Sequence, residues 1–242
     1  MEGAWSVFLF ALLTAAATGL GALPFAFLRT LSPQVVAYAN ATAGGLMLGA
    51  SFGLVSAGTE RGGWQTIAGA FVGVVFILAT QRILARYDIR FVKARGAGAR
   101  QAALIVVVMT VHSFSEGVAV GVAFGGGAAL ALVITLAIAV HNIPEGLAIS
   151  AVLRPRGSSV ASCAAWSVVS SLPQPVMAVP AFLFVEQFQM ALPYGLGFAA
   201  GAMVFMVLVE LLPEAYERAR KPAVALLVSL TMVAMVLFQR QL

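Results

Sequence analysis

The chain has 242 residues, of which 61% are hydrophobic and 10% charged, and it carries a formal net charge of +5. Its mean hydropathy of +0.99 excludes an ordinary soluble domain and predicts an all-α membrane protein that crosses the bilayer several times. The basic residues gather between apolar segments, as membrane topology requires, so the charge indicates no nucleic-acid partner. Cys163 is the only cysteine, which excludes a disulfide framework and a thiolate metal cluster.

Eight apolar segments follow one another, each near the roughly 20 residues that a helix needs to cross a bilayer. We expect transmembrane helices at 5–27, 35–57, 64–85, 101–124, 128–153, 159–185, 191–213 and 222–240. They occupy nearly all of 1–242, so a single integral membrane domain is expected. The first segment lacks a basic start and is too long for the apolar core of a signal peptide, so we interpret it as a span.

The distribution of lysine and arginine predicts how these spans are oriented. An even number of spans puts both termini on one side, and 12 of the 14 basic residues fall in alternate connections; Arg61 and Arg240 are the exceptions. The positive-inside rule therefore predicts a multi-pass protein of the cell (inner or plasma) membrane with both termini external. The basic connection at 86–100 would be cytoplasmic, and it contains neither histidine nor cysteine.

Both histidines of the chain stand in the same pattern, His112-x-x-x-Glu116-Gly and His141-x-x-x-Glu145-Gly. Residues four apart share a helix face, so each pattern projects one imidazole and one carboxylate in one direction. At about 1.5 Å per residue, His112 lies about 17 Å and His141 about 20 Å into its span, near mid-membrane. The short glycine connection at 125–127 predicts two antiparallel neighbouring helices whose four side chains meet at one depth.

Two such patterns in the membrane interior indicate a metal site. An ionisable side chain at this depth costs roughly 2.5–3.5 kcal/mol, so hydrogen bonds that merely pin two helices together are the weaker explanation. Imidazole and carboxylate ligands suit Zn²⁺ and its transition-metal neighbours, whereas Ca²⁺ and Mg²⁺ prefer oxygen alone. Pro144 predicts a broken helix beside His141, with the carbonyl of Val140 freed, which is a recurring feature of transporter sites.

The pattern His-x-x-x-Glu-Gly in the fourth span and His-Asn-x-Pro-Glu-Gly in the fifth resemble the ZIP (Zrt/Irt-like protein) family of divalent metal transporters, prokaryotic type. The eight spans, the long basic connection and the segment from Gly197 to Glu214 are similar to that family too. The resemblance implies a ZIP-like bundle, a homodimer and a binuclear midplane site. The residues that match its first metal position are His112, Glu116, His141 and Glu145.

The second metal position of the family falls on Ser113, Asn142 and Gln174, beside the two motif glutamates. Ser113 stands where the family usually has an amide, and Gln174 stands where it usually has a carboxylate. A second cation would therefore gain less attraction and still be repelled by the first. We expect one well-formed metal site and a weak or empty second one, although Gln174 could instead pin two helices through its amide.

Glu210 and Glu214 lie four residues apart toward the cytoplasmic end of the seventh span. The resemblance implies a metal exit path there. The alternative is an interfacial ion pair with Arg218, because charges are cheap at helix ends.

The resulting hypothesis is a carrier, facilitative or proton-linked, that moves Zn²⁺, and secondarily Cd²⁺, Fe²⁺ or Mn²⁺, toward the cytosol by alternating access. The metal is cargo and no cofactor is expected; the partners are metal ions and the lipid bilayer. An intramembrane metal-dependent hydrolase is the rival, but catalytic zinc usually has three protein ligands and an open position, whereas four ligands converge here. No enzyme activity is therefore expected. A metal-gated regulator without flux stays open.

Overall fold

A computed structural model of the protein describes residues 2–86 and 97–241, and the side chains of 3–83 and 106–241. The described residues contain helices and no strands, which confirms the prediction of an all-α chain. Most of the basic connection at 86–100 lies outside the described residues, so the expectations for it are untested.

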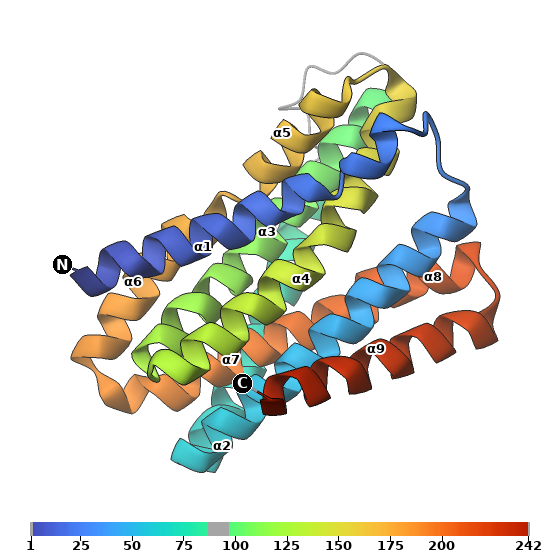
Figure 1. The fold of residues 1–242 in the computed structure, drawn as a ribbon. Coiled ribbons are helices and arrows are strands. Elements are labelled where there is room, and N and C mark those ends of the chain that lie inside the picture. The colour runs from blue at the N-terminus through green and yellow to red at the C-terminus, as the bar shows by residue number, and fades with distance from the viewer. Residues whose placement is uncertain (1, 87–96, 242) are drawn as a thin grey trace.

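The helices follow the predicted segments closely (Figure 1). They are α1 (Glu2–Leu20), α2 (Pro33–Arg86), α3 (Ala97–Gly125), α4 (Ala128–Leu153), α5 (Val160–Ser171), α6 (Pro173–Gln187), α7 (Leu192–Met206), α8 (Leu212–Arg218) and α9 (Lys221–Gln241). Short 3-10 helices cover Leu23–Ala26, Arg154–Arg156 and Gln189–Ala191, and a π-helix at Val207–Leu211 joins α7 to α8. Three of the predicted spans, 5–27, 159–185 and 191–213, are thus built from helical pieces in series.

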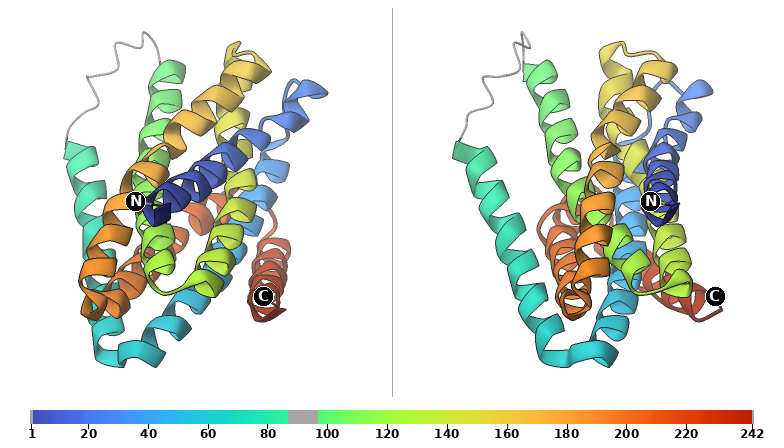
Figure 2. Two further views of the ribbon diagram at one scale, coloured as in Figure 1. Left: turned by 60° about the vertical axis from the view of Figure 1, so that its left-hand side comes forward. Right: turned by 90° about the vertical axis from the view of Figure 1, so that its left-hand side faces the viewer.

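Helix α2 contains two of the predicted spans. A straight helix of its 54 residues would be about 81 Å long, far beyond a hydrocarbon core of about 30 Å. The backbone of Gly62 is not helical, and the chain turns back on itself there (Figure 2). We call 33–61 the first arm and 63–86 the second arm. Over the described residues, seven helical segments are long and apolar enough to cross a membrane, α2 counting as one of them.

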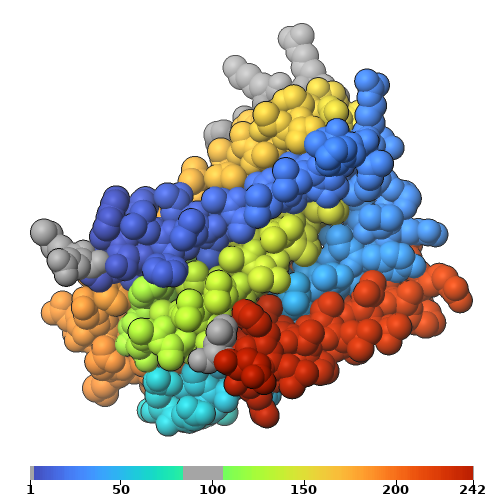
Figure 3. Space-filling model, viewed as in Figure 1, coloured from blue at the N-terminus to red at the C-terminus, as the bar shows by residue number. Residues whose placement is uncertain are grey.

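The helices pack in two groups. Helices α1, α3, α4, α5 and α6 contact one another, and α2 packs with α7, α8 and α9. On the face drawn in Figure 3, α4 and the first arm of α2 lie between α1 and α9. The motif helices α3 and α4 run side by side, as predicted, and they also meet the second group, α3 against α7 and α4 against α2. The two histidine patterns therefore lie close to the boundary between the groups.

Two cavities mark the ends of the bundle. At one, which we call the Gly62 end, an open cavity of about 510 Å³ lies between the reversal of α2, the α3–α4 turn and the end of α9. Arg61 donates a hydrogen bond of 3.2 Å to the carbonyl oxygen of Gly126 there. At the other, which we call the basic end, a cavity of about 150 Å³ is bordered by Pro33, Val152 and Arg218. The reversal of α2 and the α3–α4 turn thus lie at the Gly62 end, whereas the start of α2 and the ends of α4 and α8 lie at the basic end. The two arms of α2 run in opposite directions, and so do α3 and α4.

The glycine that follows each motif glutamate lets a neighbouring helix approach. A Cβ added at Gly117 would lie 2.5 Å from the carbonyl oxygen of Gln174 at the start of α6. One added at Gly146 would overlap the carbonyl oxygen of Thr18 on α1. Small residues permit this backbone-to-backbone contact between membrane helices. The pattern Glu-Gly thus places a carboxylate and a close helix contact side by side.

Replacing Gly146 with alanine should destabilise the protein, because the new Cβ would collide with the backbone of Thr18. Overpacking of this kind costs about 1–3 kcal/mol, and occasionally more. Gly63→Ala is the matched control, since nothing lies within 4 Å of a Cβ added there. We expect a lower melting temperature in detergent for Gly146→Ala alone. Equal melting temperatures for the two variants would contradict the close contact of α1 with α4.

Candidate metal centre

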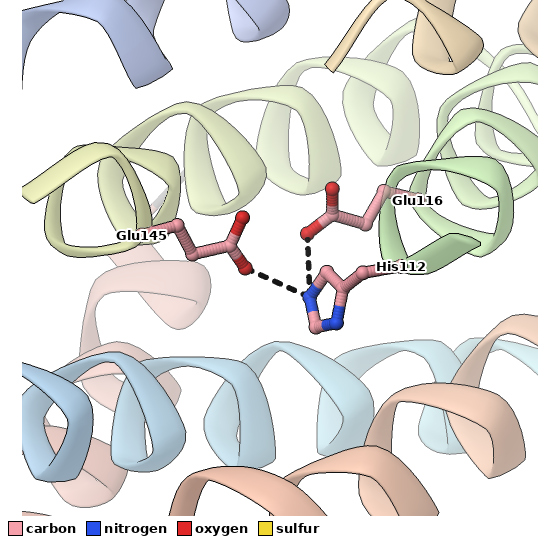
Figure 4. Close-up of side chains that lie close together, drawn as sticks. All are labelled: His112, Glu116 and Glu145. Carbon is pink, nitrogen blue, oxygen red and sulfur yellow. Dashed lines mark ion pairs between the residues drawn. The ribbon is translucent and has the colours of Figure 1, made fainter. Parts of the chain in front are cut away.

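Three motif side chains meet between α3 and α4 (Figure 4). His112 Nε2 lies 2.7 Å from Glu145 Oε1 and 3.3 Å from Glu116 Oε1. All three residues are buried, and one potential ligand atom from each lies within 4.8 Å of the others. Such a cluster of one imidazole and two carboxylates has the composition and the spacing to hold a metal ion.

His141 adjoins this group through Glu116. Its Nε2 lies 2.6 Å from Glu116 Oε1, and its side chain is fully buried. Glu116 Oε1 therefore faces both imidazoles, one from its own helix and one from α4. The structure brings together all four residues that the two sequence patterns single out, although His141 touches the three-residue group only through Glu116.

The expected break of α4 at Pro144 is not seen. The helix continues through Pro144 from Ala128 to Leu153. Proline has no backbone N–H, so the carbonyl of Val140 still lacks its helical donor. His141 and Glu145 keep the four-residue spacing of a regular helix, and this spacing aims both toward α3.

Two of the three residues at the second metal position belong to a hydrogen-bond network on the far side of Glu116. Gln174 donates from Nε2 to Glu116 Oε2. Asn142 Nδ2 donates to Gln174 Oε1 at 3.2 Å and to the backbone carbonyl of Thr14 at 2.8 Å. Ser113 is buried, and its hydroxyl has no hydrogen-bond partner among the residues that the structure describes. The second position is thus occupied by hydrogen bonds between protein groups.

Two neighbours of this site were not expected. The hydroxyl of Thr14 lies 2.6 Å from Gln174 Oε1, and Met206 Sδ lies 2.8 Å from His112 Nδ1. Thr14 and Thr18 are buried polar residues four apart in an apolar helix, and that spacing was a usable signal. The sequence gives no comparable signal for Met206, because methionine in an apolar helix is an ordinary core residue.

Glu210 and Glu214 do not act as a pair. Glu210 accepts a hydrogen bond of 2.6 Å from Gln81 on the second arm of α2, whereas Glu214 accepts one of 3.0 Å from Asn40 on the first arm. Glu214 also forms the ion pair with Arg218, at 3.0 Å. The π-helix between α7 and α8 includes Glu210 and adds a residue to the turn. This insertion directs the two carboxylates to different arms.

The comparison with known protein families gives one match, to the ZIP zinc transporter model, over residues 89–238. The chain belongs to the ZIP zinc transporter family. Its members are transporters and not enzymes, so the hydrolase alternative is not favoured. As a member of this family with several membrane-spanning helices, the chain is a multi-pass integral membrane protein of a family that transports zinc.

Relatives of this ZIP chain include bacterial and plant proteins. It is 33% identical over 224 residues to "Zinc transporter GufA" of Myxococcus xanthus, which covers 85% of this chain and 87% of that protein. It is 47% identical over 234 residues to "Putative zinc transporter At3g08650" of Arabidopsis thaliana, across 95% of this chain. The chain spans only 38% of the length of this plant relative. These relatives support membership of the ZIP family, but they do not confirm the expected prokaryotic type.

Loss of Glu116 should destabilise the metal-free protein more than loss of Glu145. Glu116 is a partner of His112, His141 and Gln174, whereas Glu145 has His112 as its one partner among the residues that the structure describes. Each buried polar group left without a partner costs about 1–3 kcal/mol. We expect Glu116→Ala to have the lower melting temperature when both variants are heated in detergent with a chelator. An equal or larger drop for Glu145→Ala would contradict the network.

Proposed function

We propose that this protein carries divalent transition-metal ions, Zn²⁺ first, across the membrane toward the cytosol. The ion would bind His112, Glu116, His141 and Glu145, and no resident cofactor is involved. The observation that supports the proposal most strongly is the position of the His112 imidazole between a thioether sulfur and two carboxylates.

This position requires a cation. A thioether sulfur has no proton to donate and accepts one weakly, so a neutral His112 ring would carry its proton on Nδ1, which faces Met206 Sδ. Nε2 of that ring then presents a lone pair to Glu116 and Glu145. Lone pairs that face one another in a buried site repel, unless a metal ion or an added proton lies between them. The arrangement is therefore suited to binding and releasing a cation.

Ligand chemistry favours zinc among the candidates. A tetrahedral zinc ion with ligands at about 2.0–2.2 Å separates its ligand atoms by about 3.3–3.6 Å. The facing nitrogen and oxygen atoms here are 2.6–3.3 Å apart, and the ligand atoms of His112, Glu116 and Glu145 all lie within 4.8 Å of one another, so side-chain movements of this scale would admit the ion. Cd²⁺, Fe²⁺ and Mn²⁺ accept the same ligand types, and we propose them as secondary cargo.

The packing supports alternating access between the two helix groups. The site belongs to the α3–α4 group and meets the other group at Met206. Toward the basic end, the small cavity is lined by Met109 and Ala148, each one helix turn from a proposed ligand. Toward the Gly62 end, Ile134 of α4 lines the larger cavity, and the buried Ile138 follows one helix turn closer to His141 along the same helix. Rocking or sliding of one group against the other would exchange these two exits.

The proposed membrane topology identifies the end of the bundle that faces the cytosol. We propose eight crossings with both termini external, the two arms of α2 each spanning once, which the reversal at Gly62 supports. The positive-inside rule then makes the basic end cytoplasmic. Glu214 lines the cavity at that end, and we propose it as part of the exit path; Glu210 would contribute from the side of the second arm. A homodimer in the cell (inner or plasma) membrane completes the proposal.

Uptake of ⁶⁵Zn²⁺ into proteoliposomes tests the function. His141→Ala and Glu145→Ala should each lower the initial rate at least about tenfold, because metal sites depend steeply on each ligand. Glu186→Ala is the control, since this carboxylate is exposed near the end of α6. Unchanged uptake by both site variants would overturn the assignment. Metal binding by the wild type without any flux would instead indicate a metal-gated regulator.

Metal stoichiometry tests the proposal of one well-formed site. Gln174→Glu would place a second carboxylate next to Glu116 Oε2, and two adjacent buried carboxylates attract an additional cation. We expect metal analysis of purified protein to give about one zinc per chain for the wild type and a value closer to about two for the variant. Gln174→Leu should stay near the wild-type value. No increase in Gln174→Glu would count against a lost second site.

A further inference from the structure

The amide network behind Glu116 has a fixed direction. It starts at the backbone carbonyl of Thr14, which can only accept a hydrogen bond. The group that Asn142 turns toward this carbonyl must therefore be its NH₂, and the same NH₂ faces Gln174. The Gln174 amide must therefore accept with its oxygen, so its own NH₂ faces Glu116 Oε2. The hydroxyl of Thr14 lies 2.6 Å from the Gln174 oxygen and 2.7 Å from the carbonyl oxygen of Ala11, so the orientation is fixed by the backbone carbonyl of Thr14 and not by this hydroxyl.

This direction divides the two oxygens of Glu116 between two tasks. Oε2 accepts the hydrogen bond from Gln174, and Oε1 faces His112 and His141. We propose that Gln174 is a specificity-determining residue of this transporter: it holds Glu116 as a one-oxygen metal ligand and so favours small four-coordinate Zn²⁺ over larger cations. The inference rests on the proposed metal site and goes beyond it.

Coordination number is the basis of this selection. Zinc is satisfied by four ligands in a tetrahedron, whereas Mn²⁺ prefers about six oxygen-rich ligands. A carboxylate that turns to offer both oxygens adds one ligand without any new residue. With its Oε2 occupied by an amide N–H, Glu116 cannot offer this oxygen unless it breaks a buried hydrogen bond, which costs about 1–3 kcal/mol. The site thus discourages ions that need more than four ligands.

Backbone packing keeps the amide in place. Gly117 brings the backbone of α3 against that of Gln174 and Pro173, in the first turn of α6. Gln174 is fully buried, as are Thr14 and Asn142. Its amide therefore has little room to turn away from Glu116. An outer partner fixed in this way orients the metal ligand that it contacts.

The test compares Zn²⁺ with Mn²⁺ in proteoliposomes and reads the coordination of bound zinc by X-ray absorption. Gln174→Leu removes the amide and frees Glu116 Oε2. We expect the KM for Zn²⁺ to rise about tenfold and the Mn²⁺-to-Zn²⁺ uptake ratio to rise at least about tenfold. The zinc coordination number should increase from about four toward about five. Asn142→Ala keeps Gln174 but removes the hydrogen bond that orients its amide. This variant should change the same three measurements by a smaller factor.

Thr18→Val is the matched control. Thr18 lies one turn from Thr14 on α1, is equally buried, and pairs with Ser171, outside the network. It should leave the uptake ratio and the zinc spectrum unchanged. A wild-type ratio and a four-ligand spectrum in Gln174→Leu, or in Asn142→Ala where the first does not fold, would overturn the inference and leave the transport function standing. Absence of metal uptake by the wild type would instead refute the proposed function itself.

Discussion

A carboxylate in the middle of a membrane protein must be surrounded by partners, and Glu116 shows how far this requirement extends. Its two oxygens face His112 on the same helix, His141 on α4 and Gln174 on α6, and Gln174 is in turn held by Thr14 on α1. An unpaired charge at this depth would cost several kcal/mol. Residues from four helices therefore take part in holding this one carboxylate. This one side chain therefore links α1, α3, α4 and α6 in the first helix group.

The two helix groups differ in how they are held. Within the first group, polar bonds and glycine contacts join the backbones closely, as between Gly146 and Thr18. Across the boundary near the site, the contacts are softer: a thioether against His112, and the ring of Phe76 stacked on that of Phe114 at 5.1 Å. Directional hydrogen bonds resist sliding, whereas apolar surfaces tolerate it. The first group is thus held together by directional contacts, whereas its contacts with the second group near the site are apolar or weakly polar.

The π-helix in the seventh span serves a separate purpose. It places Glu210 against Gln81 and Glu214 against Asn40, so each carboxylate has an amide partner on a different arm of α2. Regular helical periodicity would have put both acids on one face, with two like charges close together. One additional residue in the turn gives the two side chains different partners and leaves Glu214, but not Glu210, beside the cavity at the basic end. Irregular helical turns often occur at functional positions for this reason.

The sequence by itself determined the helical spans, the pairing of α3 with α4 and the two His-x-x-x-Glu patterns, because apolar length and four-residue spacing are local properties. Only the tertiary structure decided which oxygen of Glu116 faces the imidazoles, that Met206 faces His112, and that the Gln174 amide donates a hydrogen bond to Glu116. It also overturned the expected break at Pro144. These features depend on which helices meet, and at what rotation. Residues about 30 to 160 positions apart in the chain, such as Asn142 or Thr14 with Gln174, carry no local pattern that reveals their hydrogen bonds.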